Sequence, residues 1–170
     1  MTEETRQDLD ELIQEHGAWV ARMVWRDKSD LEGLALCFSE IGEAYDEYVK
    51  ADPAEFLVEL ADIVLRVADL MQDSARIPPS QAMESAVGVA LPTTLNKMSL
   101  MLLQVSWMAK AVNEARHTIG RPLSAECCKE LGVVLRLCFY LADLQGDDLL
   151  GAIRHKIQIN ATRGTRGRQI

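Results

Sequence analysis

The feature that most restricts the fold of this chain is an apolar stripe with helical spacing in two consecutive segments. Between residues 31 and 50, apolar side chains recur at intervals of three and four, and the same spacing resumes from residue 54 to residue 72. The connection is only Ala51-Asp52-Pro53, and proline is well suited to the first turn of a helix. So short a connection predicts an antiparallel helical hairpin over residues 31–72.

Helical spacing also appears in the rest of the chain. Residues 6–26 carry one apolar stripe, and residues 97–117 and 124–145 form a second helical pair separated by Gly120-Arg121-Pro122. We predict that residues 73–96 are a connector with one short helix near 81–87, and that residues 148–170 form a last helix and a basic tail. The whole pattern predicts one all-α domain over residues 1–170, a helical bundle with a four-helix-bundle-like core.

The two helical pairs resemble each other in sequence. Leu34-Ala35-Leu36-Cys37 aligns with Leu100-Met101-Leu102-Leu103, and Glu59-Leu60-Ala61-Asp62 aligns with Glu130-Leu131-Gly132-Val133. In this alignment the second pair keeps the apolar pattern and loses most of the carboxylates. A degenerate internal repeat and a chance similarity between two amphipathic helix pairs both account for the pattern.

Composition and charge argue against several classes of protein. A hydrophobic fraction of 48% with 26% charged residues is typical of a globular domain. A net charge of −8 argues against a nucleic-acid partner, and no segment approaches the ~20 apolar residues of a membrane span. The acidic start of the chain does not resemble a signal peptide, and the four cysteines form no C-x-x-C pair. We therefore expect a cytoplasmic protein with reduced core thiols.

Charge is divided unevenly along the chain. Residues 1–62 hold 17 acidic and five basic side chains, whereas after Asp148 no acidic residue occurs and five basic residues do. The two ends of the chain therefore have opposite electrostatic character. An acidic site and a basic segment that act on the same ligand would explain this division.

Carboxylates are placed to meet within the predicted hairpin. Glu40 and Glu43 share one helix face, as do Glu59 and Asp62, and Glu47 extends the first row. Packing about a turn near residues 52–53 is expected to bring Glu43 level with Asp62 and Glu47 level with Glu59. Crowded carboxylates repel one another unless a counter-ion is present, and a hard divalent cation such as Mg²⁺ or Mn²⁺ would supply it. A solvated acidic face is the alternative interpretation.

Two motifs resemble a known family. Ser39-Glu40-Ile41-Gly42-Glu43-Ala44, followed by Glu59-Leu60-Ala61-Asp62-Ile63-Val64, resembles the E-x-x-E…E-x-x-D signature of the all-α, MazG-like nucleoside triphosphate pyrophosphohydrolases. The segment Lys156-x-x-x-Asn160-x-x-Arg163 is similar to the C-terminal K…N…R segment of that family. The resemblance covers residues 31–72 well, residues 150–168 moderately and residues 73–147 hardly at all.

The resemblance implies a Mg²⁺-dependent enzyme, with Mn²⁺ as a substitute. Such an enzyme cleaves a ribo- or deoxyribonucleoside triphosphate by attack of water at the α-phosphate, and releases the monophosphate and pyrophosphate. The resemblance also implies a homodimer or a higher homo-oligomer. Carried over to this chain, it assigns the metal ligands to Glu40, Glu43, Glu59 and Asp62. It assigns the contacts with the substrate phosphates to Lys156, Asn160 and Arg163, and Arg166 of the basic tail is a further candidate for them.

The resemblance is incomplete at the position before the first motif acid. Family members often have a second glutamate there, an attractive general base, whereas this chain has Ser39. Either Glu47 or a metal-bound hydroxide would then take that role, so the candidate catalytic carboxylates are Glu40, Glu43 and Glu47. Related enzymes often stack the nucleobase on aromatic rings, which makes base-pocket candidates of Trp19, Trp25 and His16.

Two other functions are consistent with the same sequence. A phosphoribosyl-ATP pyrophosphohydrolase-like enzyme of the same superfamily would use similar metal chemistry on a different substrate. A non-catalytic helical interaction module would instead keep its acidic rows solvated and contact a partner through its basic tail. Metal binding separates the interaction module from both enzymes, because only the enzymes need a cation.

Overall fold

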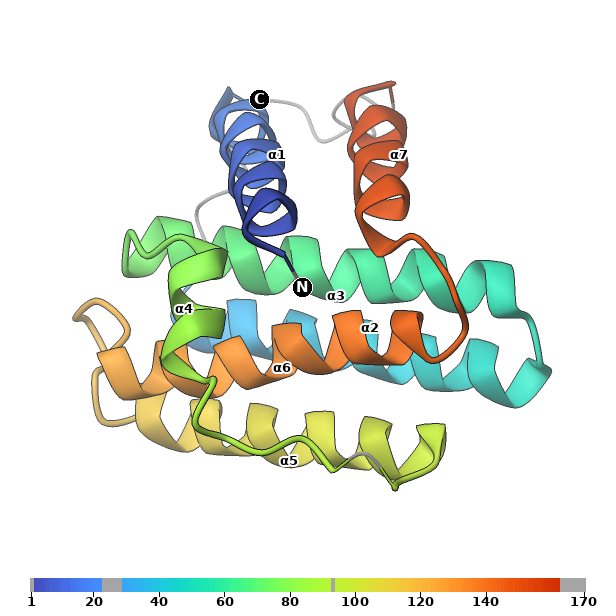
Figure 1. The fold of residues 1–170 in the computed structure, drawn as a ribbon. Coiled ribbons are helices and arrows are strands. Elements are labelled where there is room, and N and C mark those ends of the chain that lie inside the picture. Colours follow the sequence, from blue (N-terminus) through green and yellow to red (C-terminus); the bar gives the residue numbers. More distant parts are fainter. Residues whose placement is uncertain (1, 23–28, 93, 163–170) are drawn as a thin grey trace.

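The computed structural model describes residues 2–22, 29–92 and 94–162. Within these residues the chain is all-α, with seven helices and no strand, as the sequence predicts (Figure 1). The helices are α1 (Glu3–Arg22), α2 (Asp30–Lys50), α3 (Pro53–Ser74), α4 (Pro79–Ser85), α5 (Lys97–Ala115), α6 (Ala125–Asp143) and α7 (Leu149–Thr162).

The ends of α2 and α3 are fixed by local capping. Ser29 and Glu32 form a capping box at the start of α2, in which each side chain bonds the backbone N–H of the other residue. Ala51 ends α2 in the left-handed conformation, at a φ of 58°. The Asp52 carboxylate accepts hydrogen bonds from two backbone N–H groups in the first turn of α3, where Pro53 begins the helix. The predicted hairpin therefore has a turn of only two residues.

Two hairpins form the core of the molecule. The α2–α3 hairpin packs on the α5–α6 hairpin, with α2 against α5 and α3 against α6. This arrangement confirms the predicted four-helix-bundle-like core. The largest fully buried side chains come from all four of these helices and from α1, and they include Ile13, Leu34, Phe56, Leu60, Met108 and Leu131. Whether the two hairpins descend from one repeat stays a prediction.

The remaining helices cover the outside of the bundle. α1 and α7 contact each other and both lie against α3, where they stand side by side above the bundle (Figure 1). α4 packs on α6, and Arg136 of α6 donates a hydrogen bond to the backbone oxygen of Val89 at 2.9 Å and another to that of Ala86. The connector between the hairpins is therefore anchored, and its predicted short helix is α4.

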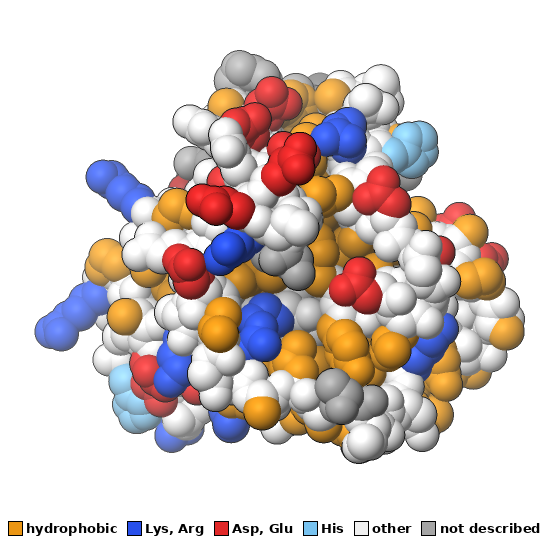
Figure 2. Space-filling view, in the orientation of Figure 1, with side chains coloured by type: hydrophobic (Ala, Val, Ile, Leu, Met, Phe, Trp, Pro, Cys, Tyr) orange, Lys and Arg blue, Asp and Glu red, His pale blue; other side chains and the backbone are white. Residues whose placement is uncertain are grey.

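The cysteines and the helix lengths bear on two expectations from the sequence, namely reduced core thiols and the absence of a membrane span. All four cysteines (Cys37, Cys127, Cys128 and Cys138) are buried and unpaired, as expected for core thiols. In the part of the chain that the structure describes, no helix has both the length and the apolar character needed to cross a bilayer. On the face drawn in Figure 2, acidic side chains gather toward α1, and apolar side chains lie over α6 and the connector.

Candidate functional site

Three of the four predicted metal ligands lie together. Glu40 and Glu43 of α2 and Glu59 of α3 each offer a carboxylate oxygen, and these oxygens all lie within 4.8 Å of one another. Glu40 is buried, with 8% of the residue exposed, Glu59 is half-buried and Glu43 is exposed. The acidic cluster, meaning Glu40, Glu43 and Glu59, therefore reaches from the protein interior to solvent. A purely solvated acidic face does not describe it.

The register of the hairpin differs from the sequence-based expectation. Glu59 lies beside Glu43 and Glu40, whereas we expected it level with Glu47. The physical reason is the turn, which comprises only Ala51 and Asp52 because α2 extends to Lys50 and α3 begins at residue 53. A turn centred between residues 51 and 52 moves each α3 residue toward the start of α2.

Glu40 is paired with a cation that the sequence analysis did not single out. Its Oε1 accepts a hydrogen bond from Nε of Arg66 at 3.0 Å. Burial raises the pKa of the Glu40 carboxyl, and the Arg66 guanidinium opposes this increase. Arg66 follows Asp62 by four residues and therefore shares its face of α3. That spacing is the signal that could have identified it.

Asp62, the fourth predicted ligand, holds a cation from a different helix. Nζ of Lys156 on α7 forms an ion pair with Oδ2 of Asp62, and only 12% and 17% of the two side chains are exposed. Lys156 is one of the predicted phosphate contacts, so α7 places it directly beside the predicted metal ligands. Two elements that lie far apart in the sequence thus meet at this site, as the charge division along the chain suggested.

Glu59 is the least compensated carboxylate of the site. Its Oε2 is buried and has no hydrogen-bond partner among the described residues. Burial raises the pKa of Glu59 to about 7, the carboxylates of Asp62, Glu43 and Glu40 act in the same direction, and Lys156 opposes them. An orphaned buried oxygen within an all-carboxylate donor set fits a hard divalent cation, which takes oxygen ligands.

Two polar side chains near the acidic cluster have local partners. Ser39, which stands where the family often has a second glutamate, donates from Oγ to Oε1 of Glu43 at 3.3 Å. Glu47 accepts from Nζ of Lys50 at 2.6 Å and is not among the clustered carboxylates. Ser39 can therefore orient Glu43, whereas Glu47 lies apart from the other candidate catalytic carboxylates.

Two of the base-pocket candidates, His16 and Trp19, lie together on α1. His16 is buried and its ring stacks on that of Trp19, with centroids 5.8 Å apart and an angle of 27° between the planes. Burial lowers the pKa of His16 to about 4, and the charge of Arg66 contributes to the decrease. His16 is therefore neutral at pH 7. The candidate Trp25 lies outside the described residues.

The other predicted phosphate contacts lie on or beyond α7. Asn160 follows Lys156 by four residues, so the two side chains share one face of the helix, and Asn160 is half-buried. Arg163 and Arg166 lie outside the described residues. Their proposed role is therefore neither supported nor contradicted by the structure.

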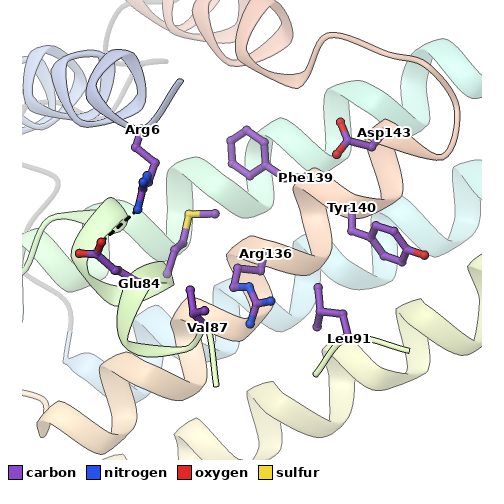
Figure 3. Close-up of a pocket in the computed structure, with 9 residues that line it drawn as sticks. Arg6, Glu84, Val87, Leu91, Arg136, Phe139, Tyr140 and Asp143 are labelled. Atoms are coloured by element: carbon purple, nitrogen blue, oxygen red, sulfur yellow. Dashed lines mark hydrogen bonds and ion pairs between the residues drawn. The ribbon is translucent and has the colours of Figure 1, made fainter. Parts of the chain in front are cut away.

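A separate hollow lies between α1, α4 and α6. It has a volume of about 390 Å³ and is lined by residues of α1, α4, α6 and the connector (Figure 3). Arg6 and Glu84 form an ion pair of 3.1 Å at one end, and Arg136 lies near the centre of the view. None of the residues predicted from the sequence to form the site lines this hollow.

The second hairpin carries a faint counterpart of the acidic cluster. Glu130, which aligns with Glu59, is buried, and its Oε2 has no hydrogen-bond partner within the described residues. Burial raises the pKa of Glu130, and Lys110 opposes this increase. The similarity concerns a single carboxylate, because the position aligned with Asp62 is Val133.

The chain was compared with protein-family models, with curated proteins and with solved structures, and none of them matches it. A function for the site therefore has to be inferred from its side chains and from the two sequence motifs. The side chains combine carboxylate oxygens that could hold a cation with a lysine ammonium at their edge.

Proposed function

We propose that this chain is a metal-dependent nucleoside triphosphate pyrophosphohydrolase. It would convert a ribo- or deoxyribonucleoside triphosphate to the monophosphate and pyrophosphate. The observation that carries the proposal is the buried, unpartnered Oε2 of Glu59 within the acidic cluster. The E-x-x-E…E-x-x-D motif supports it, because three of its four acidic side chains form the cluster.

The donor set indicates which residues would hold the metal. Glu40, Glu43 and Glu59 offer oxygens close together, and Asp62 borders them. When bound, Mg²⁺ would neutralise phosphate oxygens and activate a water for in-line attack at the α-phosphate. Mn²⁺ prefers the same ligands and should substitute for it.

The chain's own residues would prepare this site for a phosphate ligand. Arg66 fixes the buried Glu40 carboxylate, and Ser39 orients the exposed Glu43 carboxylate. Lys156 brings a positive charge to the edge of the acidic cluster, where it can neutralise a phosphate group. In this proposal Glu47 has no catalytic role, because it pairs with Lys50 and is not among the clustered carboxylates.

Product analysis tests the reaction. Each canonical NTP and dNTP, dUTP and phosphoribosyl-ATP would be incubated with the protein and with Mg²⁺, Mn²⁺ or EDTA. We expect pyrophosphate and monophosphate with either metal and neither product with EDTA. Release of orthophosphate would contradict cleavage between the α- and β-phosphates, and turnover of phosphoribosyl-ATP alone would favour the related enzyme class.

Substitutions connect the reaction to the site. Glu43→Gln should abolish pyrophosphate release, since Glu43 is the exposed carboxylate of the acidic cluster. Glu47→Gln is the matched control and should retain activity, because Glu47 lies outside the cluster. Suppose that the unmodified protein and both variants release no product, and that no metal raises the Tm of the unmodified protein. The non-catalytic interaction module then becomes the better interpretation.

We also propose that the chain forms a homodimer or a higher homo-oligomer in the cytoplasm. α5 exposes an apolar stripe at helical spacing, formed by Met98, Leu102 and Val105, which are 41%, 62% and 40% exposed. The four unpaired thiols fit a reducing compartment. Light scattering after size exclusion tests the assembly. A species larger than 19 kDa that Leu102→Glu dissociates would support it, and a 19 kDa species would contradict it.

A further inference from the structure

Two of the four predicted metal ligands already hold a cation supplied by the protein. Arg66 bonds Glu40, and Lys156 bonds Asp62. The two pairs differ in their surroundings, since the Arg66 side chain is 48% exposed and the Lys156 side chain is 12% exposed. Lys156 is thus a largely buried ammonium that neutralises a largely buried carboxylate.

We propose that Lys156 is a resident counter-ion of Asp62 that a divalent cation displaces, and that the displaced ammonium then binds the phosphates of the substrate. This inference rests on the proposed function, because it concerns the same metal ligands. It assigns Lys156 two successive partners, a carboxylate before the metal binds and a phosphate afterwards. Before the metal and the substrate bind, Lys156 therefore only holds the Asp62 carboxylate in place.

Electrostatics provides the reason for the displacement. Without a metal, the carboxylates of Asp62, Glu59 and Glu40 repel one another, and the Lys156 ammonium offsets part of this repulsion. A divalent cation bound through Asp62 would lie beside that ammonium, where two positive charges repel strongly in a partly desolvated site. The cation and Lys156 therefore compete for the same carboxylate.

The geometry of α7 allows the ammonium to move without the helix. Leu149 and Ile153 are buried in the core, so they hold the helix against the bundle. A lysine ammonium is a point charge on a flexible stem, and it can change partner by rotation about side-chain bonds. We therefore expect a local change at Lys156 and no displacement of α7.

This competition predicts how metal and substrate affect each other. A metal alone must displace Lys156 without offering it a new partner, so it binds weakly. A triphosphate bound at the same time gives the ammonium a new partner, so metal and triphosphate bind more tightly together than separately. By linkage, each of the two ligands strengthens the other to the same extent.

Binding of Mn²⁺ in the absence of nucleotide tests the competition directly. The titration would compare the unmodified protein with Lys156→Met and with the control Lys50→Met, which removes the same charge from the pair with Glu47. We expect Lys156→Met to bind Mn²⁺ about tenfold more tightly, and Lys50→Met to change the affinity far less.

The outcomes of this titration separate the two proposals. Equal Mn²⁺ affinities for Lys156→Met and Lys50→Met would overturn the displacement while leaving the metal site intact. Mn²⁺ binding that is lost in Lys156→Met would overturn it as well, since Lys156 would then support the metal. Absence of Mn²⁺ binding in all three proteins would overturn the metal site and the displacement together.

A second measurement needs no variant. In the unmodified protein, an amine-reactive acylating reagent should label Lys156 slowly, because the ion pair buries its ammonium. Saturating Mg²⁺ should increase the labelling of Lys156 several-fold relative to that of the exposed Lys50, as measured by mass spectrometry. Adding a non-hydrolysable triphosphate should reduce it again. Labelling of Lys156 that does not respond to Mg²⁺ would contradict the displacement.

Discussion

Glu40 on α2 accepts a hydrogen bond from Nε of Arg66 on α3 at 3.0 Å, although Glu40 is buried and the Arg66 side chain is half exposed. The pair joins the two helices of the hairpin beside the acidic cluster. It also explains how a carboxylate so deep in the fold is accommodated without a metal. Its strength can be measured.

Arg66→Met should destabilise the protein by about 1–3 kcal/mol, because it leaves the buried Glu40 carboxylate without its partner. Arg66→Met combined with Glu40→Gln should recover part of this loss, since the buried charge is then gone as well. Urea unfolding at pH 7 measures both effects. The control is Arg154→Met on the exposed surface of α7, for which we expect a change within about 0.5 kcal/mol.

Glu59→Gln should stabilise the metal-free protein above pH 7, with an increase in Tm of roughly 2–5 °C. The pKa of Glu59 is about 7 in the folded state, against an ordinary glutamate value of 4.5 in the unfolded chain, so the folded protein holds the proton to higher pH. The carboxyl therefore favours folding below pH 4.5, and this contribution is lost as the pH rises through 7. Glutamine cannot ionise, so the Glu59→Gln protein does not lose this stability as the pH rises.

The same substitution should also remove the increase in Tm that Mg²⁺ produces, since it removes the unpartnered oxygen. Thermal unfolding at pH 5 and pH 8, with and without Mg²⁺, measures both effects. Glu47→Gln is the control and should leave the metal response intact. A Glu59→Gln protein that still responds to Mg²⁺ would show that this oxygen does not bind the cation.

His16 makes stability depend on pH in the opposite sense. Its pKa is about 4 in the folded protein, against an ordinary histidine value of 6.5 in the unfolded chain, so the unfolded chain binds the proton first as the pH falls. The stability that His16 contributes is complete above pH 6.5 and is lost as the pH falls through 4. Between pH 7 and pH 4 the unmodified protein should lose about 3 kcal/mol more than His16→Gln loses. Urea unfolding at several pH values would show the difference, with the exposed His155→Gln measured as the control.

Replacement by alanine of two glycines on different helices should change the free energy of unfolding in opposite directions. A Cβ at Gly132 of α6 would lie 2.2 Å from the backbone oxygen of Ala82, so Gly132→Ala should push α4 away and cost about 1–3 kcal/mol. At Gly42 of α2 no atom lies within 4 Å of such a Cβ, and Gly42→Ala should stabilise the helix by about 0.5–1 kcal/mol. Urea unfolding distinguishes them, and equal effects would contradict the packing of α4 on α6.

The helices were predictable because their apolar spacing and caps are local. The capping side chain of Ser29, the start of α3 at Pro53 and the burial of the four cysteines all follow from neighbouring residues or from residue type. The partners of the charged side chains were not predictable in the same way. Arg66 on α3 reaches Glu40, which lies 26 residues earlier on α2. Lys156 on α7 reaches Asp62 on α3.

The grouping of carboxylates was predictable only in part. The sequence placed Glu40, Glu43 and Glu59 in one hairpin, but the expected register paired Glu59 with Glu47. The error arose because helical spacing does not reveal how far each helix continues into a turn. Ala51 ends α2 in the left-handed conformation, which few residues other than glycine adopt and which the sequence did not indicate.

Both residues of the turn between α2 and α3 fix how the two helices meet, since Ala51 takes the left-handed conformation and the Asp52 carboxylate caps α3. One extra residue within the first turns of α3 would rotate the rest of that helix by about 100° relative to its start, because a helix has 3.6 residues per turn. The apolar stripe of α3 would have to turn out of the core, or Glu59 and Asp62 would have to leave Glu40 and Glu43. A one-residue insertion or deletion in this part of α3 would therefore force the chain to give up either part of its core or its acidic cluster.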